Sequence, residues 1–351
     1  MAKAKKKILT KKSDLYFAMK ETVKKAKGVE SLFLDDDFTP LRVKAVLPTG
    51  LINLDRNLCV SEDGEWGLPV GRIISIKSKP AVGKTTFLLT LARQTIKRGG
   101  IVHFTESEHA LDLPYARKIC PQVDQILISQ PDTLEEAFDS VNVAVNLCMK
   151  ARAKTNTDAP FLIIMDSFSG FSPSSEFSGD FSTGGKALGE HARIASMACR
   201  KLTGPLSKAK ALLVLSHQVK SNIKIRWGSP DTAIGGEAFN YHDSICLSLY
   251  RMKSTKDSKD RVNGHYGIIK TTKNKLFPPH REARFRIVNG KGFVPAFSIL
   301  EFLMTRKEVV KKGAWFHFKK DKGLTWQGVE NFAEFLKNNK KARLLVKGLI
   351  K

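Results

Sequence analysis

Short apolar runs alternate with longer amphipathic stretches through the middle of the chain. Four runs, at residues 72–77, 101–105, 161–165 and 211–216, are too uniformly apolar to have one face in water. We therefore expect each run to form a strand that is buried on both faces of a sheet. Such strands occur mainly in parallel sheets covered by helices.

Helical periodicity fills the intervals between these runs. It predicts helices at residues 84–98, 134–152 and 190–202, the first of which ends before a pair of glycines. Strands that alternate with helices from about residue 45 to residue 290 predict an α/β fold, with a mostly parallel central sheet flanked by helices.

The two ends of the chain differ from this central region. Residues 13–27 have the pattern of a short amphipathic helix, and the tail combines short helical patterns with a small β segment around Trp315 and many lysines. We expect an N-terminal basic segment with a helix and a linker (1–44), a core domain (45–295) and a small basic C-terminal α/β domain (296–351).

Basic residues strongly outnumber acidic ones. The 351-residue chain has 59 lysines and arginines against 34 aspartates and glutamates, a formal net charge of +25. A field of this sign attracts polyanions, so nucleic acid is the favoured partner and an anionic membrane surface is the weaker alternative.

Neither a membrane span nor a secretory signal is indicated. No stretch approaches the ~18 uninterrupted apolar residues of a spanning helix, and the lysine-rich start lacks the apolar segment of a signal peptide. The five cysteines lack the paired spacing of zinc sites or disulfide frameworks and are expected to be buried free thiols. We therefore expect a cytoplasmic protein with no membrane partner.

A phosphate-binding loop is the clearest chemical motif. Residues 78–86 follow the first predicted strand and open the first predicted helix, so backbone N–H groups and a helix N-terminus can point at phosphates. Gly83 lets the backbone approach closely, Lys84 would reach the β and γ phosphates, and Thr85 would ligate Mg²⁺. The predicted nucleotide-binding residues of the loop are Ser78, Lys79, Pro80, Ala81, Val82, Gly83, Lys84, Thr85 and Thr86.

Ser78 departs from the usual form of this motif. Glycine normally occupies the first position, so the turn there must accept a residue with a Cβ atom. A chance Gly-Lys-Thr tripeptide in an ordinary loop is the alternative interpretation. It is disfavoured because strand, loop and helix follow one another in the required order.

Carboxylates follow two of the predicted strands. Asp166 ends the run at residues 161–165, where it could hold Mg²⁺ through water, and structural capping is its alternative role. Glu106 and Glu108 follow the run at residues 101–105, where a carboxylate could activate water for attack on the γ phosphate. Residue chemistry alone does not choose between these two glutamates.

In combination, these residues resemble those of the bacterial RecA recombinases, the strand-exchange ATPases of homologous recombination. The similarity extends from Thr49 and Gly50 through the C-terminal domain. Its clearest stretches are residues 67–73, 108–118, 129–133, 235–236, 273–275 and 313–316. The resemblance implies a phosphate-loop ATPase core that uses ATP with Mg²⁺.

The resemblance also implies roles within the nucleotide site. It selects Glu108 over Glu106 as the general base, and it makes Gln218 a sensor of the γ phosphate that could pull the following loop. It places Tyr115 on the adenine and Asp112 beside the base or the ribose. Packing in the core is the alternative role of Tyr115.

Two lysines are implied to act across a subunit boundary. In RecA-like filaments ATP lies between protomers, and Lys273 and Lys275 match the pair with which a neighbour completes the site. A spacing of two along a strand presents both side chains to one side. The resemblance thus implies self-association into a helical filament, with the catalytic residues Glu108, Lys84, Gln218, Lys273 and Lys275.

Two loops and one helix are implied to bind DNA. A first loop at residues 176–189 and a second at residues 219–236 would hold single-stranded DNA, the second through cations and apolar wedges. Side chains on one side of the next helix would contact the DNA backbone, or else form a solvated face. The predicted DNA-binding residues are Leu188, Arg193, Ser196, Arg200, Lys220, Ile223, Lys224, Arg226, Trp227, Gly235 and Gly236. Leu188 and Glu237 stand where the family usually has methionine and asparagine, which leaves the detailed footprint open.

The resemblance implies an ATP-dependent recombinase that forms filaments on single-stranded DNA, pairs it with homologous duplex DNA and exchanges strands in recombination and repair. A hexameric DNA helicase with the same core fold is one alternative, but it should lack the N-terminal helix and the segment at residues 313–316. A DNA-coating protein that does not hydrolyse ATP is the other, and Ser78 is its only support.

Overall fold

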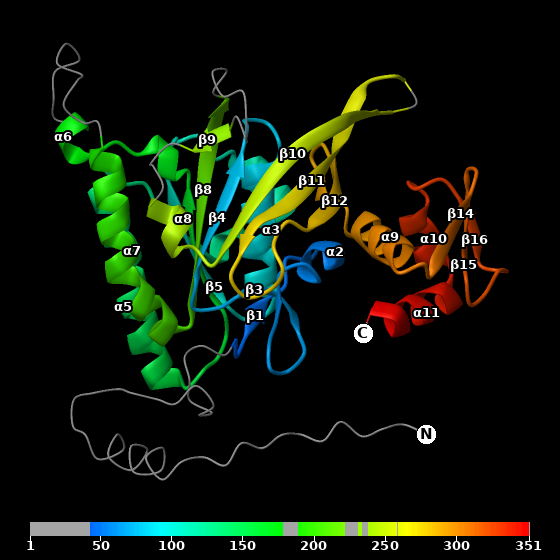
Figure 1. Cartoon of the computed structure of the whole chain (residues 1–351), viewed down its shortest axis with the longest axis horizontal. Coiled ribbons are helices and arrows are strands. Elements are labelled where there is room, and N and C mark those ends of the chain that lie inside the picture. Colours follow the sequence, from blue (N-terminus) through cyan, green and yellow to red (C-terminus); the bar gives the residue numbers. More distant parts are fainter. Residues whose placement is uncertain (1–42, 178–188, 222–230, 234–237, 258, 351) are drawn as a thin grey trace, which may run out of the picture. The chain divides into compact units, whose positions relative to one another are not determined.

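A computed structural model describes residues 43–177, 189–221, 231–233, 238–257 and 259–350 (Figure 1). The predicted helix at residues 13–27 lies outside this part of the chain, and all elements below belong to the unit Lys44–Lys351. No helix in the described residues is long and apolar enough to cross a membrane. The five cysteines are free thiols, four of them buried and Cys148 half-buried.

The centre of this unit is a large mixed sheet. Its strands lie in the order β13-β12-β11-β10-β4-β8-β7-β5-β6, and β9 pairs with β8. The part from β10 to β6 is parallel, whereas β11, β12, β13 and β9 run antiparallel to their neighbours. The strands are β4 (Ile73–Ser78), β5 (Ile101–Glu106), β6 (Ile126–Ser129), β7 (Phe161–Asp166), β8 (Ala211–Ser221), β9 (Asp231–Ala233), β10 (Ile245–Lys256), β11 (Val262–Asn274), β12 (Glu282–Val288) and β13 (Gly292–Phe293).

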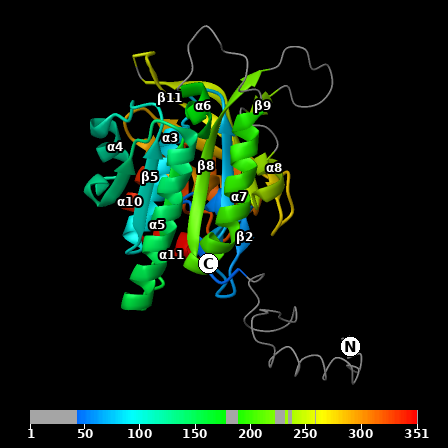
Figure 2. The same ribbon diagram turned by 90° about the vertical axis from the view of Figure 1, so that its left-hand side faces the viewer.

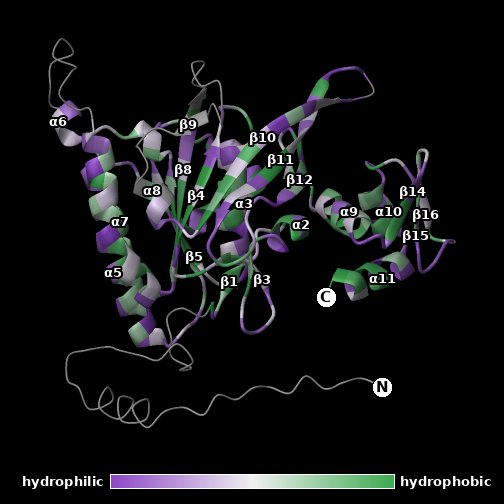
Figure 3. Cartoon of the chain, viewed as in Figure 1, coloured by the Kyte–Doolittle hydropathy of each residue, from purple (hydrophilic) through white to green (hydrophobic). Residues whose placement is uncertain are grey.

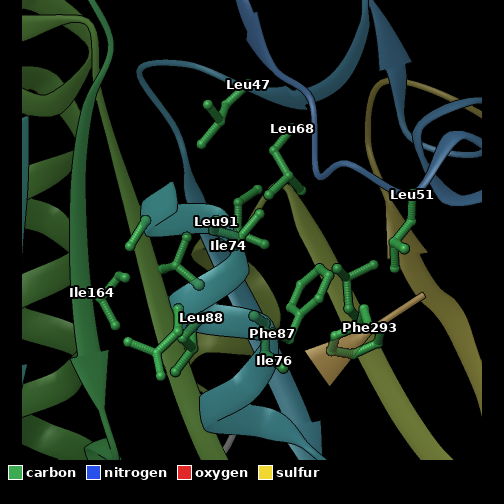
Figure 4. Close-up of a cluster of buried hydrophobic side chains, with 14 of the residues drawn as sticks. Leu47, Leu51, Leu68, Ile74, Ile76, Phe87, Leu88, Leu91, Ile164 and Phe293 are labelled. Atoms are coloured by element: carbon green, nitrogen blue, oxygen red, sulfur yellow. The ribbon is translucent and has the colours of Figure 1, made fainter. Parts of the chain in front are cut away.

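The four predicted strands are confirmed as β4, β5, β7 and β8, and they are neighbours in the parallel part. Successive side chains of these strands enter different cores. Ile74 and Ile164 belong to the core around the helix that follows the phosphate loop (Figure 4), whereas Ile73 and Ile163 belong to the core on the other face. Because helices cover both faces, the middle of each strand tolerates few polar residues, which explains the uniformly apolar runs.

Helices cover the two faces of the parallel part. The principal ones are α3 (Lys84–Lys97), α4 (Leu113–Ile119), α5 (Leu134–Thr155) and α7 (Glu190–Ala209). Helices α5 and α7 lie side by side on one face (Figure 2), and both alternate hydrophobic and hydrophilic positions (Figure 3). The α7 helix continues past its predicted end at residue 202 and through Pro205, because Leu206 and Ala209 extend its buried stripe.

The strands β10 to β13 and β6 were not among those predicted. Buried and half-buried positions alternate along much of β11, as expected for a strand with one face only partly covered. Such a strand has no continuous apolar run to mark it. Smaller elements complete this region, namely β1 (Val46–Leu47), α2 (Ile52–Asp55), β2 (Cys59–Val60), β3 (Trp66–Pro69), α6 (Ser174–Phe177) and α8 (Ala238–His242).

A small three-stranded sheet lies near the C-terminus. It contains β14 (Val309–Lys312), β15 (Trp315–Phe318) and β16 (Thr325–Gln327), between α9 (Pro295–Thr305) and the helices α10 (Phe332–Asn338) and α11 (Lys340–Ile350). Phe316, Trp326 and Phe332 belong to a separate hydrophobic core there. The predicted β segment around Trp315 is confirmed as β15. Our boundaries at residues 44/45 and 295/296 stay predictions.

Candidate nucleotide-binding and catalytic site

The phosphate loop joins the end of β4 to the start of α3. Gly83 has a φ of 106°, and a Cβ atom there would lie 2.4 Å from Ile287 Cδ1, so the position requires glycine. Within the loop, the non-glycine residue with a left-handed backbone is Ala81, with a φ of 58°. Ser78, in contrast, is the last residue of β4 and pairs with Gln218 and Leu249 on the neighbouring strands. The demanding turn that we expected at Ser78 is therefore absent, and a serine side chain fits there without a left-handed backbone.

Lys84, Thr85 and Asp166 meet at the carboxyl ends of the parallel strands. Lys84 Nζ lies 3.9 Å from Asp166 Oδ1, and Thr85 Oγ1 donates a hydrogen bond of 2.8 Å to Asp166 Oδ2. The Ser216 hydroxyl donates to Asp166 Oδ1. A hydroxyl next to a carboxylate is a donor set that suits Mg²⁺. Sequence reasoning missed Ser216, because a serine within an apolar run gives no signal of its own.

Burial dominates the electrostatics of this cluster. It lowers the pKa of Lys84, which the nearby Asp166 and Glu108 carboxylates oppose. It raises the pKa of Asp166, which Lys84 and the two hydroxyl donors oppose. Each charge in the cluster is thus stabilised chiefly by the others, so removing one should perturb the rest.

The two glutamates after β5 have different surroundings. Glu106 is buried and accepts hydrogen bonds from the backbone N–H groups of Glu108 and Ala110, at 3.1 and 3.2 Å, and from Gln130 Nε2, at 3.0 Å. Both carboxylate oxygens of Glu106 are therefore used in hydrogen bonds that stabilise the loop after β5. Glu108 is exposed, and its Oε1 accepts from Gln218 Nε2 at 2.7 Å and from Ser167 Oγ at 3.2 Å. The geometry thus favours Glu108 as the carboxylate that can meet a water molecule.

Tyr115 lies in α4, and Asp112 directly precedes that helix. The Tyr115 hydroxyl shares a 2.6 Å hydrogen bond with Thr86 Oγ1, and the ring packs against the core around α3. Asp112 is exposed at the residue before α4. The structure brings Tyr115 to Thr86 of the loop, and the predicted contacts with adenine and ribose stay predictions.

Lys273 and Lys275 are held by a different part of the chain. Lys273 Nζ lies 2.7 Å from Asp243 Oδ1, and Lys275 Nζ donates a hydrogen bond of 2.7 Å to the Tyr241 carbonyl oxygen. These partners belong to α8 and the residue after it, not to the Lys84 cluster. Their expected role across a subunit boundary stays a prediction. Sequence reasoning did not identify Asp243, whose contact depends on the fold.

Most of the predicted DNA-binding residues lie outside the described residues. These are Leu188, Ile223, Lys224, Arg226, Trp227, Gly235 and Gly236, together with Glu237. The segment expected to be a second loop begins as strand, because β8 runs to Ser221 and pairs with β9. Lys220 belongs to that paired part. On α7, Arg193 and Arg200 are exposed and Ser196 is half-buried, an arrangement that suits either a DNA backbone or solvent.

Comparison with known proteins agrees with this geometry. The chain matches the family described as the RecA N-terminal domain over residues 14–294. It is 35% identical over 303 residues to Protein RecA of Ruegeria pomeroyi, an alignment that covers 86% of this chain and 82% of that relative. Proteins of the same name from Gluconobacter oxydans and Acidiphilium cryptum are each 37% identical over 294 residues, with 84% of this chain and 79% and 80% of the relatives covered. The phosphate loop, Glu108, Asp166 and Gln218 all fall within the matched region, and the chain belongs to the RecA family of recombinases.

Proposed function

We propose that this chain, a RecA-family recombinase and DNA-dependent ATPase, assembles with ATP and Mg²⁺ into a helical filament on single-stranded DNA. The filament would pair the bound strand with homologous duplex DNA and exchange strands in recombination and repair. The observation that supports this most directly is the hydrogen bond from Gln218 to Glu108. Gln218 lies in β8, which leads into the segment expected to bind DNA, so one bond connects that segment to the catalytic carboxylate.

Glu108 would act as the general base for hydrolysis. Water attacks the γ phosphorus while Glu108 accepts its proton, and the bond from that phosphorus to the β–γ bridging oxygen breaks to leave ADP and phosphate. The hydrogen bonds from Gln218 and Ser167 fix the carboxylate orientation. Lys84 would neutralise phosphate charge. Thr85 and Asp166 would hold Mg²⁺, which also neutralises the charge that develops on the phosphates.

Gln218 would report the state of the nucleotide to the DNA-binding segment. Its amide bonds to Glu108, and its backbone N–H bonds to Ser169 Oγ at 3.0 Å. A γ phosphate can compete for the same amide, which would displace β8 and the residues beyond it. Lys273 and Lys275 of a neighbour would complete the site, so hydrolysis would depend on filament assembly.

The alternatives to this function gain little from the structure. The non-hydrolysing coat rested on Ser78, and Ser78 fits a regular strand position. A helicase shares the core fold, so the assembly itself must separate it from a recombinase. The proposed function places the protein with DNA in the cytoplasm, bound to single-stranded and homologous duplex partners.

Three measurements test the proposed function. ATP turnover of the full chain should rise when single-stranded DNA is added, and strand exchange should be detectable with a homologous duplex. Electron microscopy with a slowly hydrolysed ATP analogue should show open helical filaments on the DNA. Closed rings would favour the helicase, and turnover that is absent with DNA would reject the ATPase mechanism.

A further inference from the structure

Asp243 is a fully buried carboxylate next to an expected catalytic lysine. It lies between α8 and β10, and its side chain has no exposed surface. Its Oδ1 is 2.7 Å from Lys273 Nζ, while Oδ2 has no hydrogen-bond partner among the described residues. Burial of a carboxylate with one partner is unfavourable compared with an apolar residue of the same size. Its presence there suggests a role for the pair beyond packing.

We propose that Asp243 is the positioning residue that holds the Lys273 ammonium for the ATP of the neighbouring subunit. This inference rests on the proposed filament function. The Lys273 side chain is 26% exposed, whereas that of Asp243 is 0% exposed. The carboxylate therefore contacts the ammonium from the interior side, and the lysine extends from that anchor toward the surface.

A flexible lysine needs such an anchor in order to act on a phosphate. Its four-carbon stem has many rotamers, and fixing it at the moment of reaction would cost entropy. A fixed partner removes most of that cost in advance. Neighbouring positive charge is a second reason for an anchor, because Lys77 and Lys79 line the same pocket of about 330 Å³ as Lys273. Without Asp243, repulsion from these cations would favour other positions of the Lys273 ammonium.

One short stretch of the chain holds both lysines. Lys275 Nζ bonds to the Tyr241 carbonyl, and the Lys275 backbone N–H bonds to the Ser244 carbonyl at 2.9 Å. Tyr241, Asp243 and Ser244 lie within a few residues of one another, in α8 and directly after it. A shift of this short stretch would therefore move the partners of both lysines together.

The first test is Asp243→Asn, which keeps the side-chain volume and removes the charge. We expect kcat for ATP turnover with single-stranded DNA to fall by about 10²-fold, with KM for ATP within about twofold, because the variant's own phosphate loop is intact. Asp63→Asn makes the same change at an exposed turn residue and should leave both constants unchanged. A parent-like kcat for Asp243→Asn would overturn the proposal.

If this variant does not fold, Asp243→Glu is used instead. Glutamate keeps the charge but moves it, so kcat should again fall, and a parent-like value would overturn the proposal equally.

Mixed filaments supply the readout that a purely structural role would not change. Glu108→Gln subunits bind ATP without hydrolysing it but keep the Asp243 and Lys273 pair, whereas Asp243→Asn subunits keep Glu108. In a head-to-tail filament of equal amounts, about one interface in four joins an intact Glu108 to an intact Lys273 anchor. Turnover of the mixture should therefore reach about a quarter of the parent value. A mixture no more active than its separate components would show that Asp243 acts only within its own subunit.

A parent without DNA-stimulated turnover would reject the proposed function itself, whereas an active parent with an unaffected Asp243→Asn variant rejects only this inference.

Discussion

Two groups of residues in this protein, one around Lys84 and one around Lys273 and Lys275, are expected to serve the same phosphate, and they are built in different ways. Lys84 lies in the phosphate loop, at the carboxyl ends of parallel strands. Its acidic neighbours are Asp166, at the end of β7, and Glu108, just after the adjacent strand β5. Lys273 and Lys275 lie at the end of antiparallel β11, and their partners come from α8 and the residue after it. The first group is assembled by a local motif, and the second by the topology of the sheet.

The electrostatic settings differ accordingly. Lys84 and Asp166 are both deeply placed, and burial is the main cause of the pKa shift of each. Burial also lowers the pKa of Lys275, with the adjacent Lys273 and Arg72 adding to the effect and Asp243 opposing it. Loss of a charge should therefore affect nucleotide binding or turnover in the first group, but turnover by a neighbouring subunit and local stability in the second.

The largest effect is expected for Lys84→Ala. It removes the cation that would contact the β and γ phosphates, and it leaves buried Asp166 without its charged neighbour. Turnover should fall by about 10³-fold, near the upper end for loss of one electrostatic stabiliser. Lys97→Ala, at the exposed end of the same helix, is the matched control and should retain parent activity. Equal losses in both variants would mean that α3 stability, not phosphate contact, explains the result.

A smaller effect is expected from a comparison of the two glutamates. Glu108→Gln should lower kcat by about 10²-fold or more, within the range for loss of a general base, while ATP binding is retained. Glu106→Gln should instead lower the free energy of unfolding by about 1–3 kcal/mol, because its carboxylate accepts two backbone N–H bonds and one from Gln130. Steady-state kinetics and thermal melts separate these outcomes. Reversed effects would make Glu106 the base.

Within the second group, the two lysines should differ in how much each contributes to the free energy of unfolding. Lys273→Met leaves the Asp243 carboxylate buried and unpaired, and it should cost about 2 kcal/mol, less than for a fully buried pair because Lys273 is part-exposed. Lys275→Met loses one bond to a carbonyl, and it should cost about 1 kcal/mol or less. Denaturant titration of both variants measures this gap. Equal costs would contradict the view that Asp243 distinguishes the two positions.

The same contrast explains what could be predicted from the sequence. The strands β4, β5, β7 and β8 were predictable because burial on both faces leaves an uninterrupted apolar run. The phosphate loop was predictable because Gly83, Lys84 and Thr85 are adjacent in the chain. The choice of Glu108 needed the resemblance, since the bonds that occupy Glu106 come from a loop and from Gln130, 24 residues away. Asp243 gave no signal, because its partner is 30 residues distant and on an antiparallel strand.

At Ser78 the sequence pattern suggested a feature that the structure does not have. A motif position suggested a strained turn, but the strand continues through that residue and the left-handed backbone lies at Ala81. Sequence patterns assign chemistry to a loop more reliably than they assign backbone angles within it. The same limit applies to β8, which extends into a segment that we expected to be a loop because β9 supplies partners for its backbone.

The smallest expected effect concerns Tyr115, whose adenine contact is predicted from resemblance alone. Tyr115→Phe removes the hydrogen bond to Thr86 and keeps the ring, so it should cost about 1 kcal/mol of stability and leave KM for ATP unchanged. Tyr115→Ala removes the ring as well, and if the ring stacks on the base it should raise KM by about tenfold, as for other base–aromatic contacts. Thr86→Val is the control, because it removes the same hydrogen bond while the Tyr115 side chain stays intact. An unchanged KM for Tyr115→Ala, together with a large loss of stability, would identify Tyr115 as a core residue that ties α4 to α3.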